Sequence, residues 1–243
     1  ASAASASTDI NGAAVVNAIN KIKNNLASFI NKNFKYKGKS IKYKSNKVLF
    51  GSKSIDFKKL ISLAHLNRIS LSSSGFYTTP KIHFNKNTFL GRPFLYFCYG
   101  AAVSEVLIDT LTGENKILRV DIIHDAGRAI NPAIELGQIE GGFVQGLGWL
   151  TTEEVSWNLN GNLSTHSPST YKIPVSKDIP EKFNVNIYEK GLNIEKTVNR
   201  SKAVGEPPLM LALSTFMALK NAVNNNNLKA PATPENILMA LQE

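Results

Sequence analysis

The chain has 243 residues, 43% of them hydrophobic, so it is long enough for one large domain or two small ones with buried cores. It has no run of eighteen apolar residues, and we therefore expect no membrane-spanning helix. The single cysteine, Cys98, excludes an internal disulfide and a cysteine-based metal cluster within this chain, and it fits a reducing cytoplasm.

The chain start and the histidines add two expectations. The opening ASAASASTDI lacks the charged region and apolar core of a secretory signal, so none is expected there. The histidines are scattered without metal-ligand spacing: His65, His83, His124 and His166. Any metal bound here is therefore expected to be held mainly by a group other than the histidines and cysteine of this chain.

The formal net charge of +10 is concentrated in one segment. Residues 21–59 carry twelve lysines, no arginine and one acidic residue, Asp56, so the rest of the chain is close to neutral. Guanine contacts and bidentate phosphate contacts usually recruit arginine. We therefore interpret the lysines as a solvated face, in preference to the alternative of an RNA-binding surface.

The first predicted element is a helix over residues 10–30, because its apolar side chains recur at three- and four-residue steps. These side chains are Val15, Val16, Ile19, Ile22, Leu26, Phe29 and Ile30. Thr8 or Asp9 is the predicted N-cap, since a short polar side chain there can accept a backbone N–H of the first turn.

Residues 31–54 alternate in polarity and contain glycines, which predicts short strands and turns. A second helix is predicted over residues 56–66, beginning at Ser54 or Asp56. Residues 75–92 show no period and are expected to be irregular.

A β-hairpin with long arms is predicted next. Residues 94–109 are rich in aromatic and β-branched side chains, residues 110–115 (TLTGEN) are typical of a turn, and residues 117–125 return as a strand.

A helix over residues 133–149 follows, with an unusual content of glycine. Interior glycines cost roughly 0.5–1 kcal/mol each relative to alanine, so we expect them to serve the close approach of another helix, backbone or ligand: Gly137, Gly141, Gly142 and Gly146. Gln138, Gly142 and Gln145 form a polar stripe with a bare centre. The alternative is ordinary packing of small residues with two surface amides.

The rest of the chain is predicted as mixed strand and loop over residues 151–200, a buried helix over 208–223, and a short C-terminal helix. Thr233 is the predicted cap of that last helix, and Pro234 suits its first position because an N–H there has no intrahelical partner.

These elements predict an α+β fold in which mixed sheets pack against helices. We expect two lobes, one over residues 1–90 and the other over residues 91–243, which holds the hairpin and the two C-terminal helices.

The motif SKAVGEPP places one carboxylate, Glu206, in a tight turn before an apolar helix. Gly205 permits backbone angles that other residues avoid, and Pro207 and Pro208 fix φ for a first helical turn. The positive end of the helix dipole favours the ionised carboxylate, and a fixed ionised carboxylate suits a general base. An ordinary acidic residue at a helix N-terminus explains the octapeptide equally well.

Several segments together resemble the xanthine dehydrogenase and aldehyde oxidase family of molybdenum hydroxylases, in the family's order and over essentially the whole chain. They are LAHLNRISLSSSGFYTTPKIHF, GRPFLYFCYGAAVSEVLIDTLTGE, RVDIIHDAGRAINPAIELGQIEGGFVQGLGWLTTEE, THSPSTYKIP and SKAVGEPPLMLALSTFMALK. The bacterial xanthine dehydrogenase large subunit is the most similar form.

The resemblance implies the C-terminal half of a molybdopterin-binding domain, part of the large subunit. The N-terminal half would then be a partner and would supply aromatic residues around the substrate and an orienting Glu or Arg. It also implies 2Fe-2S clusters and FAD on other domains or on a partner subunit, NAD as the electron acceptor, and a dimer of heterodimers. Neither a nucleic acid nor a membrane is an expected partner.

By resemblance, Glu206 matches the family's general base, which takes a proton from a molybdenum-bound hydroxyl as that oxygen attacks a purine carbon. Ala4 and Ser5 match a tight loop against the molybdenum and the pterin, with the backbone of Ala4 near the metal and no side-chain ligand. Gln138 matches a glutamine that contacts the pterin, and Gly205 is the hinge beside Glu206. Without the resemblance, the Ala/Ser-rich beginning of the chain would predict a flexible tail.

Two further residues are weaker candidates. Gln145 lies one step along the same helical face as Gln138, and Lys202 could pair with the cofactor but is expected to face solvent. The segments favour xanthine or hypoxanthine as the substrate, although an aldehyde oxidase of the same family would share the base.

Two other functions stay open from the sequence. The chain could be a non-catalytic remnant that folds without a complete site, or a basic nucleic-acid-binding module centred on residues 21–59. Steeply salt-dependent binding would mark the second, and as a fragment alone the chain is expected to be inactive.

Overall fold

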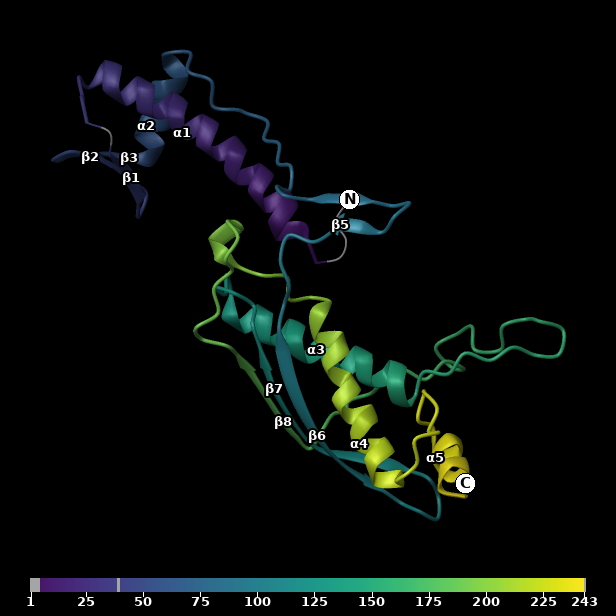
Figure 1. The fold of residues 1–243 in the computed structure, drawn as a ribbon. Helices are drawn as coiled ribbons and strands as arrows, with labels where there is room; N and C mark the ends of the chain where they lie inside the picture. Colours follow the sequence, from purple (N-terminus) through teal and green to yellow (C-terminus); the bar gives the residue numbers. More distant parts are fainter. Residues whose placement is uncertain (1–4, 39, 243) are drawn as a thin grey trace. The chain divides into compact units, whose positions relative to one another are not determined.

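The computed structural model describes residues 5–38 and 40–242. The chain forms two compact units, a smaller one over Ala6–Lys81 and a larger one made of Ala1–Ser5 and Ile82–Glu243. The division therefore falls a few residues before the expected boundary between residues 90 and 91, and the beginning of the chain belongs to the larger unit. Helices and sheets occur in both units (Figure 1), as an α+β fold requires.

The smaller unit packs two helices on a small sheet. Its elements are a π-helical turn Thr8–Gly12, α1 (Ala13–Asn33), β1 (Ile41–Lys44), β2 (Lys47–Phe50), β3 (Lys53–Asp56) and α2 (Phe57–Leu66). The three strands are antiparallel neighbours in the order β1-β2-β3. The predicted strands and both predicted helices are present.

The core of the smaller unit joins α1, β2 and α2. Its buried members are Leu26, Phe29, Ile30, Val48, Phe50, Leu60 and Ala64. The first half of the predicted apolar stripe behaves differently, because Val15, Val16 and Ile19 remain exposed.

The two predicted N-caps of this unit have different outcomes. The Asp56 side chain accepts a hydrogen bond from the backbone N–H of Lys59 at 3.1 Å, which confirms Asp56 as the cap of α2. The prediction of Thr8 or Asp9 as the first cap is wrong. Both residues lie inside the π-helical turn, and the residue before it, Ser7, makes no side-chain cap bond.

An extended segment after α2 returns along α1. Side chains of α1 donate to its carbonyl oxygens, in the pairs Asn17 to Phe76 (2.8 Å), Lys21 to Ser74 (2.9 Å) and Asn25 to Ser70 (3.1 Å). These bonds satisfy backbone groups of a segment that belongs to no sheet.

The larger unit is built on a three-stranded sheet with the order β6-β7-β8. Its strands are β6 (Gly100–Ile108), β7 (Asn115–His124) and β8 (Lys182–Ile187). β6 and β7 are antiparallel, which confirms the predicted hairpin, while β8 runs parallel to β7. A parallel neighbour needs a long crossover connection, and α3 (Pro132–Thr151) supplies it.

Helix α3 covers one face of this sheet, together with a short 3₁₀ helix Pro207–Ala212, called η3, and α4 (Leu213–Val223) (Figure 1). Buried residues of β7, α3 and η3 form the main core: Ile117, Val120, Ile122, Ile139, Phe143, Leu147, Leu150 and Ala212. The predicted helix over 208–223 is therefore helical throughout, but its first turns are 3₁₀ rather than α.

A second core of this unit lies between α4 and α5 (Pro234–Gln242). It contains Leu219, Val223, Leu228, Ala232, Ile237 and Ala240. The Thr233 hydroxyl accepts the backbone N–H of Asn236 at 3.3 Å, so the predicted cap before Pro234 is confirmed.

The prediction that residues 75–92 are irregular is wrong in its second half. A two-stranded hairpin pairs β4 (His83–Asn85) with β5 (Leu90–Arg92). Each arm has three mostly exposed residues, and so short an exposed strand leaves little alternation in the sequence. A short 3₁₀ turn, Val198–Arg200, completes the helices and strands of the unit.

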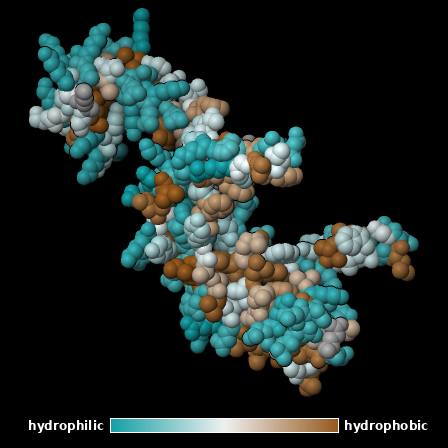
Figure 2. Space-filling model, viewed as in Figure 1, coloured by the Kyte–Doolittle hydropathy of each residue, from teal (hydrophilic) through white to brown (hydrophobic). Residues whose placement is uncertain are grey.

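The surface chemistry differs between the units. In the smaller unit every lysine of residues 21–59 that the structure describes is exposed, and hydrophilic residues cover much of its visible surface (Figure 2). No helix among the described residues is both long and apolar enough to cross a membrane.

Candidate functional site

The turn that carries Glu206 lies directly before η3. Glu206 is the N-cap residue of this short helix, with φ −100° and ψ −37°, and its side chain makes no cap bond. The carboxylate is exposed, and it has no hydrogen-bond or ion-pair partner within residues 5–38 and 40–242. It is therefore open to a proton donor from outside this chain.

Two glycines of α3 let η3 and the preceding turn approach the helix closely. A Cβ on Gly142 would lie 3.2 Å from Cβ of Pro208 and 3.3 Å from the carbonyl oxygen of Gly205. A Cβ on Gly146 would overlap the carbonyl oxygen of Leu209. The expectation of close approach is confirmed at these two positions.

The other two glycines of α3 meet no helix or backbone among the described residues, and the approach of a ligand to them stays a prediction. Nothing described lies within 4 Å of a Cβ built on Gly137 or Gly141. The predicted polar stripe of Gln138, Gly142 and Gln145 does not have an open middle position. Gly142 is buried, because the turn at Gly205 and the start of η3 pack against it.

Three separate parts of the chain meet at Gly205. A Cβ there would lie 2.8 Å from Ser5 Oγ and 3.2 Å from Gln138 Oε1. Ser5 Oγ also accepts the backbone N–H of Glu206 at 2.8 Å. The absence of a side chain at Gly205 is therefore what allows the start of the chain, α3 and the Glu206 turn to come together.

The other candidates from the sequence stand as follows. Ala4 lies outside the described residues. Gln145 is exposed further along α3, and it is absent from the contacts found at Gly205 and Glu206. Gln138 is exposed and its amide, like the Glu206 carboxylate, has no hydrogen-bond partner in the described parts of the chain.

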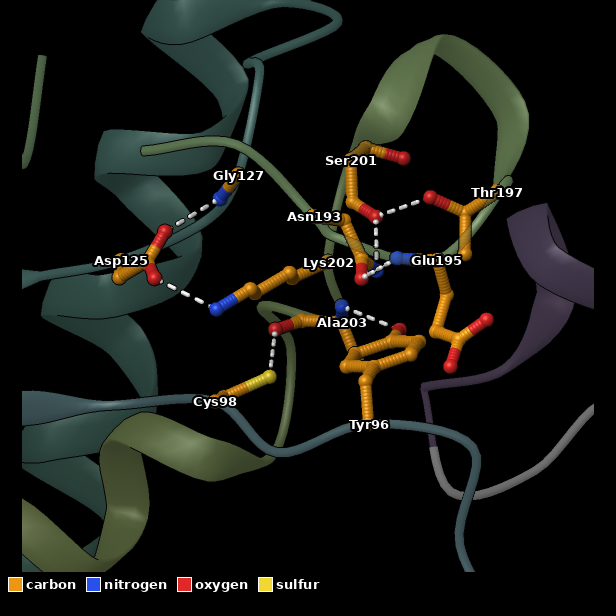
Figure 3. A network of polar contacts seen from close by, with 10 residues as sticks. All are labelled: Tyr96, Cys98, Asp125, Gly127, Asn193, Glu195, Thr197, Ser201, Lys202 and Ala203. Carbon is orange, nitrogen blue, oxygen red and sulfur yellow. Dashed lines mark hydrogen bonds and ion pairs between the residues drawn. The ribbon is translucent and has the colours of Figure 1, made fainter. Parts of the chain in front are cut away.

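The expectation that Lys202 faces solvent is wrong. Its side chain is only 7% exposed, and its Nζ donates to Asp125 Oδ2 at 2.5 Å (Figure 3). Nζ also lies 5.0 Å from the centroid of the Tyr99 ring, where a cation is attracted to the aromatic face. A charged amine this well buried needs such partners, because an unpaired charge is costly to remove from water.

A polar network next to this ion pair was not predicted from the sequence either. Asn193 is fully buried, and its amide donates to the carbonyl oxygen of Ser201 at 3.0 Å. The Thr197 hydroxyl donates to the same oxygen at 2.6 Å (Figure 3). Nothing in the local sequence distinguishes these side chains from ordinary loop residues.

The side chains at the junction around Gly205 are hydrogen-bonding groups and one carboxylate. No group of three or more His, Cys, Asp or Glu side chains that could hold a metal ion occurs among the described residues. The junction instead offers an unpartnered amide on Gln138, the Ser5 hydroxyl and the unpartnered Glu206 carboxylate around a side-chain-free Gly205. These residues fit the rim of a pterin-held metal, with hydrogen-bonding groups for the organic part and a free carboxylate beside it.

Comparison with protein families identifies the class of the chain. The sequence profile of the Molybdopterin cofactor-binding domain matches residues 1–180, about three quarters of the chain. The chain therefore belongs to the family of molybdopterin cofactor-binding domains.

Curated relatives refine this class. The Xanthine dehydrogenase/oxidase of Felis catus is 44% identical over 248 residues, which cover 97% of this chain and 17% of that protein. The Xanthine dehydrogenase of Dictyostelium discoideum is 41% identical over 97% of this chain and 17% of its own length. The chain thus spans about a sixth of the length of these relatives.

Solved structures agree with the fold. A reconstituted CO dehydrogenase from Oligotropha carboxidovorans superposes with a TM-score of 0.77 at 20% identity, covering 98% of this chain and 29% of that one. The Aldehyde Oxidoreductase from Desulfovibrio gigas gives a TM-score of 0.66 at 26% identity, over 75% of this chain and 20% of that one. The chain therefore has the fold of part of these two enzymes.

Proposed function

We propose that this chain forms part of the active site of a molybdenum hydroxylase that oxidises a purine such as xanthine or hypoxanthine, with Glu206 as the general base. The meeting of Ser5, Gly205 and Gln138 beside Glu206 carries the proposal, because it occurs in a chain of the molybdopterin cofactor-binding family. The names of the curated relatives favour a purine over an aldehyde.

The chemistry divides between the cofactor and the chain. When bound, the molybdenum–pterin cofactor supplies the redox chemistry of the hydroxylation. The chain supplies a carboxylate with no competing partner among the described residues, held at the start of η3. An ionised carboxylate within hydrogen-bond reach of the reacting group can accept its proton during the reaction.

The remaining candidates hold the cofactor rather than react. We propose that Gln138 donates its amide to a polar group of the pterin, and that the Ser5 hydroxyl orients the Glu206 backbone through its 2.8 Å bond. We also propose the backbone of Ala4 as the part of the chain nearest the metal. Electrons would leave through 2Fe-2S clusters and FAD on other domains or a partner subunit, to NAD.

The rest of the assembly is proposed on the same basis. The N-terminal half of the molybdenum subunit would complete the site with substrate-binding residues, and the working unit would be a dimer of heterodimers in the cytoplasm. Because the chain spans about a sixth of its relatives' length, we expect it to be inactive by itself.

The test is Glu206→Gln in the full-length enzyme, with Glu235→Gln as its matched control. Both are exposed acids at the beginning of a helix, so the control represents an ordinary N-terminal acid. Loss of a general base typically costs about 10²–10⁴-fold in rate. We expect that loss in kcat for xanthine only in Glu206→Gln, with molybdenum and pterin content unchanged in both variants.

Retention of more than a few per cent of turnover by Glu206→Gln would overturn the base assignment. Turnover of aldehydes but not of xanthine by the native enzyme would replace the purine with the aldehyde substrate. Absence of molybdenum and pterin from the native full-length protein would support a non-catalytic remnant instead.

A further inference from the structure

The backbone before the Glu206 turn pairs with the residues that follow β7. The Lys202 N–H donates to the carbonyl oxygen of Ala126 at 2.8 Å, and Gly127 and Ser201 form an isolated antiparallel bridge. The segment Ser201–Ala203 is therefore fixed along one edge by the residues that follow β7.

The other edge of the same segment is held by the extended residues that precede β6. The Ala203 N–H donates to the hydroxyl of Tyr96 at 2.8 Å, and the thiol of Cys98 donates to the Ala203 carbonyl oxygen at 3.0 Å (Figure 3). Both backbone groups of Ala203 are thus bonded to side chains from a distant part of the sequence.

The Lys202–Asp125 ion pair adds a side-chain link between this segment and the residues that follow β7. Both side chains are largely buried, with 7% and 18% exposure. The second oxygen of Asp125 accepts the Gly127 N–H at 2.8 Å, so the carboxylate is held at both oxygens. A buried pair with good geometry fixes the relative position of the two backbones that carry it, because separating the charges would leave both unpaired.

Only three residues separate Lys202 from Glu206, and the last of them is the hinge Gly205. The far side of the turn is set by η3 on the glycine face of α3. Four extended residues span at most about 14 Å, so fixing Lys202 limits where the turn can begin. Lys202 acts on Glu206 through the backbone and does not contact the group that Glu206 would contact. A hinge glycine cannot hold the turn alone, since it has the widest backbone freedom.

We infer that the Lys202–Asp125 ion pair is a positioning device for Glu206. It anchors the backbone four residues before the carboxylate so that the carboxylate keeps its alignment with the reacting proton. This inference rests on the proposed function of Glu206. A misplacement of about 1 Å can cost on the order of 10²-fold in rate, so the ion pair is expected to act on turnover and much less on substrate binding.

The first experiment compares Lys202→Met with the double variant Lys202→Met/Asp125→Asn in the full-length enzyme. We expect Lys202→Met to lower kcat about 10–100-fold, to change KM less than about threefold, and to leave molybdenum content unchanged. The double variant removes both charges and so folds even if a lone buried Asp125 does not. Its kcat is expected to match that of the single variant, because coupled residues are not additive.

The matched control is Lys116→Met, which removes the same kind of side chain from the ion pair with Glu181. That pair is exposed, with 61% and 53% of the two side chains accessible, and exposed pairs contribute little. We expect native kcat and KM from this variant.

Repeating the Lys202→Met substitution in a Glu206→Asp enzyme distinguishes a loss of positioning from a general structural defect. Glu206→Asp keeps a carboxylate but shortens its reach, so it has already lost the alignment that Lys202 maintains. We expect Lys202→Met to cost less than about threefold in that background. An equal loss in both backgrounds would mean that the ion pair serves the fold as a whole, and it would overturn the inference.

The outcomes also separate this inference from the proposed function. Native kcat in both Lys202→Met and the double variant overturns the positioning role, even where Glu206→Gln is inactive. An active Glu206→Gln enzyme overturns the base assignment itself, whatever Lys202→Met does.

Discussion

The imidazole of His124 lies at the end of the buried face of β7, next to Asp125 in the chain. It is 2% exposed, and neither ring nitrogen has a hydrogen-bond partner in the part of the chain that the structure describes. Burial is the main cause that lowers the pKa of His124, the charge of Lys202 lowers it further, and Asp125 opposes them. His124 is therefore kept neutral beside a buried ammonium group.

This environment predicts an acid-sensitive stability. The unfolded chain binds a proton at His124 near its ordinary pKa of about 6.5, while the folded chain binds it only at lower pH. The contribution of His124 to the free energy of unfolding is therefore fully present above about pH 6.5. It falls as the pH is lowered towards the folded pKa of His124, and it does not change further below that pKa. Within that window the slope approaches about 1.4 kcal/mol per pH unit.

The measurement is the free energy of unfolding in urea at several pH values for the native chain and His124→Leu. We expect the variant to lose the part of the pH dependence between pH 6.5 and the folded pKa. His166→Leu, which replaces an exposed histidine of the same unit, is the control. An unchanged profile in His124→Leu would contradict the assignment.

At the scale of elements, the glycines of α3 divide into two kinds. Gly142 and Gly146 face η3, whereas Gly137 and Gly141 face open space within the described chain. Both kinds cost helix propensity, but only the first kind is required for packing. The sequence could not distinguish the two kinds, because the spacing of the four glycines does not reveal which face of the helix another backbone occupies.

Gly146→Ala and Gly141→Ala form a matched pair that tests this division. The new methyl at 146 would overlap the Leu209 carbonyl and lie 2.9 Å from Cβ of Ala212, so we expect a loss of about 1–3 kcal/mol from overpacking. The methyl at 141 meets nothing, so we expect a gain of up to about 1 kcal/mol from helix propensity. Urea unfolding of the chain measures both, and equal effects of the two substitutions would refute the division.

Local patterns predicted elements better than they predicted partners. Apolar periodicity located α1, a capping residue located the start of α2, and strand-forming residues around a turn sequence located the β6–β7 hairpin, since each signal lies within a few residues. The burial of Lys202 was missed because its partner Asp125 lies 77 residues away in the sequence. The choice between solvent and an ion pair for a lysine depends on such a distant neighbour.

At the scale of the whole molecule, the candidate site depends on chain topology. Ser5, Gln138 and Gly205 come from the start, the middle and the end of the sequence, and no local pattern indicates that they meet. The resemblance to molybdenum hydroxylases is what named these residues from the sequence. The structure adds the reason they can meet, which is a side-chain-free Gly205 on the glycine face of α3.

The distribution of charge gives a last prediction. The described lysines of residues 21–59 are exposed and lie in the smaller unit, whereas Glu206 and its neighbours belong to the larger one. None of these lysines is among the residues that we propose to hold the cofactor or to accept the proton. We therefore expect replacement of Lys35, Lys37, Lys42 and Lys44 by glutamine to leave kcat and KM of the full-length enzyme within about twofold of native.

The same variant tests the alternative of a nucleic-acid-binding module. Non-specific contacts to phosphates weaken steeply with salt, so we expect the native chain to bind duplex RNA only at low salt and to release it by about 0.2 M. Retention of RNA at that salt by the native chain, but not by the lysine variant, would contradict the interpretation of a solvated face. The lysines would then form a binding surface separate in function from Glu206, because the two groups of residues lie in different units.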